Sequence, residues 1–106
     1  MLADSLFVSD KVHERMVKLS DGSEYKMWFK ELSAIEFRRF HIAEQSADEE
    51  KQAASMAKLI AASLCEEDGK PAITYKQALK LTALAMNALS MTILEVNGFG
   101  GAEKNG

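Results

Sequence analysis

The alternation of apolar and polar residues distinguishes the segment 12–30 from the rest of the chain. Val17 and Leu19 flank Lys18, and a second alternating run follows a stretch rich in turn-forming residues. The apolar members of that second run are Tyr25, Met27 and Phe29. A period of two is typical of half-buried β-strands, so this segment is predicted to form a β-hairpin.

The hairpin register follows from its loop. A three-residue loop at 20–22, with Gly22 in a left-handed conformation, aligns Val17 with Tyr25 and keeps the apolar side chains on one face. A two-residue loop would mix the two faces. Two strands alone are only marginally stable, so this face is expected to need a helical cover.

A first helix is predicted to begin at Ser33, because Glu36 three residues later completes a capping box. Its apolar side chains are expected to cover the hairpin, while Arg38 and Arg39 point outward as a solvated face. These apolar residues are Ile35, Phe37, Phe40 and Ile42.

A second capping box, Ser46 with Glu49, predicts a helix that continues to Cys65. Its apolar positions, at helical spacing, are Ala53, Met56, Ile60 and Leu64. The following segment 66–71 combines three acidic residues with a glycine and a proline, a composition typical of a turn.

A third helix is predicted from Thr74, with Gln77 as its capping partner, to about Val96, closed by Asn97 and Gly98. One apolar stripe along it contains Leu79, Thr82, Met86, Leu89, Ile93 and Val96. A second stripe, roughly opposite, contains Leu81, Leu84, Ala88 and Met91. Because a helix that is apolar nearly all round must be covered nearly all round, the second stripe is a candidate partner-binding surface. The alternative is that the hairpin covers one stripe and the other helices cover the other.

These elements predict an α+β fold, in which an N-terminal β-hairpin packs against a bundle of about three α-helices. The expected organisation is an N-terminal tail over 1–11, a single domain over 12–97 and a flexible glycine-rich tail over 98–106. A chain of 106 residues suits one domain with one core.

The formal charge of −3 and the acidic runs argue against nucleic acid as a partner. No apolar run approaches the roughly 20 residues that cross a bilayer, so no membrane association is expected. The single cysteine cannot form an internal disulfide, and the first residues lack the pattern of a secretory signal. These features favour the cytoplasm.

The residue types that support catalysis or metal binding occur without a supporting motif. Cys65 ends an apolar stripe, where an inert buried thiol is the usual interpretation. His13 and His41 have no partner at metal-ligand spacing, and the acidic turn lacks the ligand pattern of a calcium loop. The chain is therefore predicted to be neither an enzyme nor a cofactor-binding protein.

A series of short motifs follows the predicted elements along most of the chain. In order they are Asp21-Gly22-Ser23, Trp28-Phe29-Lys30-Glu31-Leu32, Glu36-Phe37-Arg38-Arg39-Phe40, Ala61-Ala62-Ser63-Leu64-Cys65, Asp68-Gly69-Lys70-Pro71, Ala85-Met86-Asn87-Ala88-Leu89 and Val96-Asn97-Gly98-Phe99-Gly100. Their order resembles that of the tail assembly chaperones of long-tailed, siphovirus-type bacteriophages.

The resemblance implies a protein of the bacterial host cytoplasm, absent from the mature virion. Such a protein binds the tape measure protein and keeps it soluble until the tail tube protein polymerises around it. The family is often made in two lengths by −1 ribosomal frameshifting, and Glu103-Lys104-Asn105 can be encoded by a slippery A-AAA-AAC sequence. The chain would then be the short form, and the longer form would contact the tail tube protein.

A structural tail-completion or virion component is the alternative. In that case the second stripe would mediate permanent self-association. The sequence leaves open the oligomeric state, the bound tape measure segment and whether a phage or a prophage carries the gene.

Overall fold

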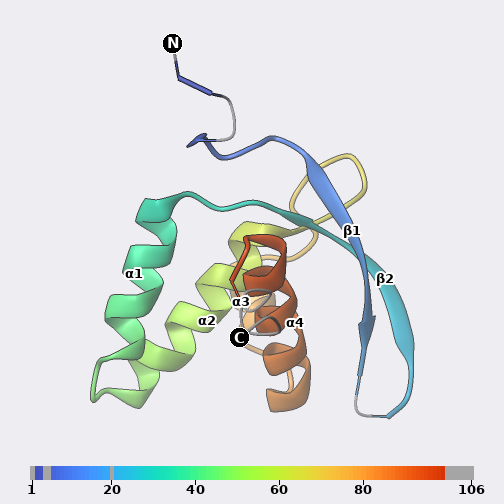
Figure 1. Ribbon diagram of the computed structural model, residues 1–106. Helices are drawn as coiled ribbons and strands as arrows, with labels where there is room; N and C mark the ends of the chain where they lie inside the picture. Colours follow the sequence, from blue (N-terminus) through green and yellow to red (C-terminus); the bar gives the residue numbers. More distant parts are fainter. Residues whose placement is uncertain (1, 4–5, 20, 100–106) are drawn as a thin grey trace, which may run out of the picture.

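The computed structural model describes residues 2–3, 6–19 and 21–99 of the chain and has the predicted α+β architecture (Figure 1). The elements within these residues are, in order, β1 (Val12–Lys18), β2 (Glu24–Lys30), α1 (Ala34–Glu44), α2 (Glu49–Ser63), β3 (Leu64–Cys65), α3 (Tyr75–Ala78) and α4 (Ala83–Val96).

The antiparallel hairpin β1–β2 has the predicted register. Val17 pairs with Tyr25, and Gly22 adopts a left-handed φ of 89° in the connecting turn. Ser20 of the predicted loop lies outside the described residues. Phe29 and Val17 point into the core, whereas Tyr25 near the turn is 48% exposed. The alternating pattern therefore identifies the buried face of the hairpin except at Tyr25.

A third strand, which the sequence analysis did not predict, completes the sheet in the order β1-β2-β3. The second helix was expected to reach Cys65, but it ends at Ser63, and Leu64 and Cys65 pair with Phe29 and Trp28 of β2. The free edge of β2 explains the difference, since its backbone groups need partners that a continued helix would not supply. The buried Ser63 hydroxyl also donates a hydrogen bond of 2.8 Å to the Lys30 carbonyl.

The start of α1 agrees with prediction, whereas the start of α2 does not. Ser33 and Glu36 form the expected capping box at α1. In α2 the cap is Asp48, whose carboxylate accepts a 2.9 Å hydrogen bond from the Glu50 backbone N–H. Ser46 instead accepts a hydrogen bond from the Asp48 backbone, so it stabilises the turn before the helix.

The predicted helix from Thr74 to Val96 is wrong as one unit, because it is interrupted after Ala78. Thr74 and Gln77 form the expected capping box, but α3 has a single turn. Thr82 then has an extended backbone and its hydroxyl accepts a 3.1 Å hydrogen bond from Ala85, which starts α4 anew. A threonine at this position favours the cap over a helix interior, because its hydroxyl satisfies a free N–H group.

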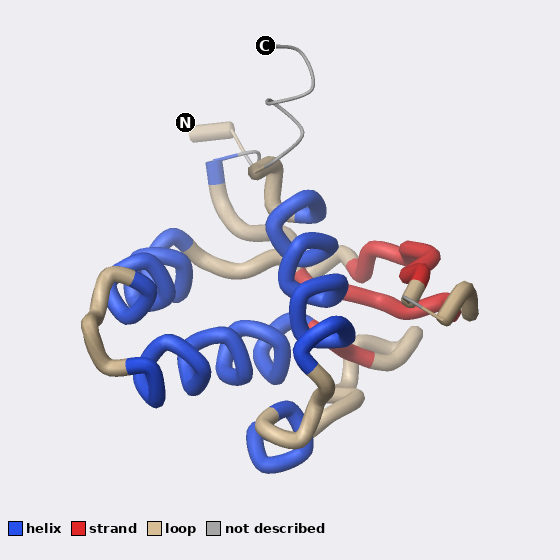
Figure 2. The backbone as a smooth tube through the Cα atoms, turned by 90° about the horizontal axis from the view of Figure 1, so that it is seen from below, coloured by secondary structure: helices blue, strands red, loops and turns tan. Residues whose placement is uncertain are grey.

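The helix that covers the hairpin is α4 instead of α1. In Figure 2, α4 lies between the sheet and the α1–α2 pair, and it contacts α2 and both hairpin strands. α1 packs mainly on α2, so Phe37 and Phe40 are buried while Ile35 and Ile42 remain exposed. The expectation that all four apolar residues of α1 cover the sheet is therefore wrong. The apolar core members that are at most 3% exposed are Val17, Phe29, Ala57, Ile60, Cys65, Ala78, Leu89 and Ile93.

The C-terminal end of α4 is tied to the start of α1. The Gly98 and Phe99 N–H groups donate to the Glu95 and Leu94 carbonyls, and Gly98 has a φ of 88°, the pattern of a Schellman motif. The Phe99 ring lies 4.8 Å from the Phe37 ring, centroid to centroid. Phe99, in the segment 98–106 that was predicted to be a flexible tail, thus contacts α1, and 100–106 lie outside the described residues.

Candidate functional site

The Cys65 side chain occupies a structural position. Cys65 is 2% exposed, and burial raises the pKa of its thiol, which suppresses the reactive thiolate. Among the described residues, no group of three or more histidine, cysteine, aspartate or glutamate side chains is arranged to hold a metal ion. The geometry at Cys65 therefore suits packing in the core.

Glu31 fastens the N-terminal segment to the domain. One of its carboxylate oxygens accepts a 3.1 Å hydrogen bond from the Ser9 backbone N–H, and the other lies 2.8 Å from Nε2 of His13. The Ser9 N–H, followed by the His13 ring, lowers the pKa of Glu31. Leu6, Phe7 and Val8, just before this anchor, are exposed. This cluster joins three segments of the chain, which is a structural role.

In the portion of the chain that the structure describes, no helix is long and apolar enough to cross a bilayer.

The predicted second stripe, of which Leu81 precedes α4 and the rest lies on it, is divided between solvent and core. Leu84 is 60% exposed and Met91 is 71% exposed. Leu81 and Ala88 are partly buried and pack against the core. Leu84 and Met91 lie seven residues apart, two helical turns, and so face the same side of α4. The structure therefore leaves two apolar side chains of the stripe exposed to solvent, with Ala88 between them.

The opposite side of α4 is buried in the core. Leu89 and Ile93 are core residues, and Met86 and Val96 pack beside them. Of the longer stripe, Leu79 and Thr82 precede α4 and are exposed. The predicted frameshift region, Glu103, Lys104 and Asn105, lies outside the described residues.

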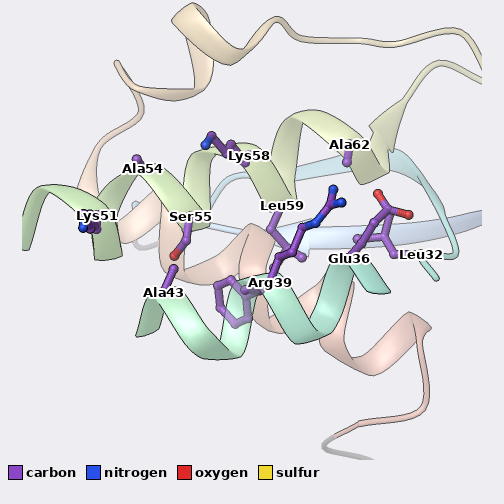
Figure 3. A pocket seen from close by; sticks show the side chains of 11 residues that line it. Leu32, Glu36, Arg39, Ala43, Lys51, Ala54, Ser55, Lys58, Leu59 and Ala62 are labelled. Carbon is purple, nitrogen blue, oxygen red and sulfur yellow. The ribbon is translucent and has the colours of Figure 1, made fainter. Parts of the chain in front are cut away.

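A groove that the sequence analysis did not identify runs between α1 and α2 (Figure 3). Its volume is about 590 Å³. In Figure 3, Ser55 projects from α2 toward Ala43 of α1 at one end. The apolar lining consists of Leu32, Phe40, Ala43, Ala54, Leu59 and Ala62. Because many of the lining side chains are small, they leave the space between the two helices unfilled.

The charged rim of the groove is mainly basic. Arg39, Lys51 and Lys58 line it together with one acidic residue, Glu36. The Glu36 carboxylate is engaged by the Ser33 backbone N–H and hydroxyl in the capping box. Within the described part of the chain, none of the three cations has a carboxylate within 4.0 Å. The groove therefore carries uncompensated positive charge on a protein whose net charge is negative.

The groove could not be predicted from the sequence, because it forms only when α1 and α2 pack against each other. Arg39 was read with Arg38 as part of a solvated face, and both are exposed. Only Arg39, however, lines the groove. The available signal was the run of small residues on α2, Ala54, Ser55 and Ala62, which follows helical spacing.

Comparison with known proteins agrees with this architecture. A protein-family model described as phage tail assembly chaperone, TAC, matches residues 1–97. The solved structure of the bacteriophage HK97 tail assembly chaperone has a similar fold, with a TM-score of 0.56 and 14% sequence identity over 79% of this chain and 84% of that one. A search of curated proteins gives no match. The family match spans nearly the whole described domain, and the chain belongs to the phage tail assembly chaperone family.

Proposed function

We propose that this chaperone binds the tape measure protein of its phage and keeps it soluble until the tail tube protein polymerises around it. The observation that carries the proposal is the exposed apolar face of α4, Leu84 and Met91, on a helix whose other side is core. In a member of a chaperone family, an apolar face on a rigid helix suits the transient covering of an apolar partner.

The side chains on this face suit a helical partner. A repeat of seven residues is the spacing by which two helices contact one another along a seam. Met91 is unbranched and polarizable, so it can repack against successive segments of a long partner. Leu81 and Ala88, partly buried beside this pair, would border the contact.

The binding test is copurification of the tape measure protein with tagged chaperone after co-expression. The double variant Leu84→Glu, Met91→Glu should lose the tape measure protein, because two carboxylates would have to be desolvated at the contact. Met16→Glu is the matched control, since Met16 is 58% exposed on the hairpin and should leave copurification unchanged.

Circular dichroism and urea unfolding distinguish the two causes of a loss. If the double variant unfolds, the chosen face belongs to the core. Retained copurification by a folded double variant would contradict the assignment of this face, whereas failure of the wild-type chain to copurify would contradict the function itself.

The chain is further proposed to be the short form of a frameshift pair, with a longer form that contacts the major tail tube protein. The support is the coding capacity of Glu103-Lys104-Asn105 for a slippery heptamer. Intact mass spectrometry of all products made from the gene with its downstream DNA should show a minor, longer product that diverges near Lys104. A single short product would contradict this proposal.

We assign the protein no catalytic activity and place its work in the host cytoplasm, before the virion is complete. The support is a family of chaperones together with the structural roles of Cys65 and His13. Purified virions should therefore lack the chain. Its presence in a fixed copy number would favour the alternative, a self-associating structural component.

A further inference from the structure

We infer that the groove between α1 and α2 binds a short amphipathic helix with acidic flanks, supplied by the protein that this chaperone holds. The inference rests on the proposed function, since it assigns a second contact surface for the same partner. It is carried by the shape of the groove, its apolar floor and its uncompensated basic rim.

The shape of the groove suits a helix. Along α2 the lining extends from Lys51 to Ala62, a helical rise of about 16 Å. About three turns of a partner helix would span this distance, enough for apolar anchors at positions i, i+3 or i+4, and i+7. Alanines and Ser55 line much of the walls, and such small residues allow the ridge of a third helix to approach closely.

The floor of the groove provides the apolar contact. Phe40 and Leu59 are core residues that reach the groove, and Leu32 borders them. A leucine or methionine side chain of the partner that packs there would transfer from water to an apolar environment, which favours binding. The backbone of the partner would stay hydrogen-bonded within its own helix, so no unpaired polar group would be buried.

The rim indicates the charge of the occupant. Arg39 extends from α1 across the groove toward α2 in Figure 3, and Lys58 and Lys51 lie on the α2 side. Cations on both walls favour a helix that carries Asp or Glu on both flanks of its apolar stripe. A basic helix would meet like charge on both sides. The rim therefore selects among the many apolar segments that a long partner offers.

The α4 face and the groove differ in what they recognise. Leu84 and Met91 lie on α4 and form no part of the groove lining, and neither carries a charge. We expect the α4 face to accept apolar segments with little selectivity and the groove to hold acidic ones. Binding through the groove should weaken as salt rises, because exposed charges are screened.

Site-specific crosslinking identifies the occupant. Benzoylphenylalanine replaces Ala62, an exposed residue of the groove lining, in the full chain co-expressed with the tape measure protein, and the crosslinked peptide is sequenced by mass spectrometry. The expected peptide has apolar residues at helical spacing flanked by Asp and Glu. The same photoreactive residue at Met16 is the control and should not capture that peptide.

Charge reversal measures the contribution of the rim. The double variant Arg39→Glu, Lys58→Glu is compared with Arg38→Glu, Lys18→Glu, which makes the same net change at exposed positions outside the groove. The groove variant should lose about tenfold or more in affinity for the captured peptide at low salt, and the control much less. Circular dichroism establishes that both variants are folded.

The outcomes separate the two proposals. If the wild-type chain binds the tape measure protein, and the groove variant and the control variant bind the captured peptide with equal affinity, the groove inference is overturned and the proposed function stays intact. A crosslinked peptide that is basic, lacks helical spacing or comes from the chaperone itself overturns the inference in the same way. Absence of any tape measure binding by the wild-type chain overturns both.

Discussion

The hairpin with α4 and the pair α1 with α2 use their apolar residues differently. Between the hairpin and α4, large side chains such as Phe29 and Ile93 are fully buried and form the core. Between α1 and α2, small side chains leave a groove of about 590 Å³. On the outer side of α1, Ile35 and Ile42 are exposed. The first region is therefore filled, whereas the proposed binding surfaces lie in the second region and on the outer face of α4.

The two regions share one apolar core, and a few polar contacts also join them. The Asn97 side chain at the end of α4 accepts a 2.8 Å hydrogen bond from the Leu32 N–H, just before α1. The carboxylate of Glu31, one residue earlier, is hydrogen-bonded to the Ser9 backbone N–H and to the His13 ring. These contacts fix the orientation of the groove relative to the core, since the Leu32 side chain also lines the groove.

The largest effect should come from the filled region. Phe29→Ala should lower the free energy of unfolding by about 3 to 5 kcal/mol, because it removes buried surface and leaves a cavity. Ile42→Ala, at a side chain that is 59% exposed, should change it by about 0.5 kcal/mol or less. Urea unfolding of both variants measures the difference, and similar losses would contradict the contrast between the filled core and the exposed outer side of α1.

An intermediate effect is expected at the junction. Asn97→Ala should lower the free energy of unfolding by about 1 to 3 kcal/mol, because the part-buried Leu32 N–H loses its partner. The side chain also donates to the Ile93 carbonyl at 2.8 Å. Asn87→Ala is the control, because Asn87 is an exposed asparagine of α4, the helix that Asn97 caps. If both variants have the same urea midpoint, the Asn97 contact contributes no net stability.

The smallest effect should appear as a pH dependence at Glu31. The pKa of Glu31 is lowered from 4.5 in the folded protein, so the contribution of its carboxylate to stability is complete above that value and is lost as pH falls through the folded pKa. Glu31→Gln should therefore narrow the difference in urea midpoint between pH 6 and pH 3. An unchanged difference would show that the Ser9 and His13 contacts do not contribute.

Local signals in the sequence predicted local structure well. The alternation around Val17 and Phe29 identified the hairpin and its register, and the caps at Ser33 and Thr74 are present. These features depend on residues close together in the chain, where period and hydrogen-bonding capacity decide the outcome. The family was also correctly identified from the order of its motifs.

The errors arose where distant segments compete. Leu64 continues the apolar pattern of α2, but the edge of β2 makes it a strand. Ile35 and Ile42 are as apolar as Phe37 and Phe40, and the positions of α2 and of Phe99 decide which of them are buried.

The sequence predicted the two candidate binding surfaces to different extents. The exposure of Leu84 and Met91 agrees with a helix that has more apolar surface than a small domain can cover. The partial burial of Leu81 and Ala88 could not be read from spacing, because it depends on what packs beside α4. The groove required the pairing of two helices, and no single segment carries its pattern.

Light scattering by the tape measure protein tests the central claim most directly. The tape measure protein of the same phage is diluted from denaturant into buffer that contains an equimolar amount of the chaperone or of an unrelated protein of similar size. The account predicts that the wild-type chaperone suppresses the rise in scattering and that the folded Leu84→Glu, Met91→Glu variant does not. Equal scattering with the wild-type chaperone and with the unrelated protein would contradict it.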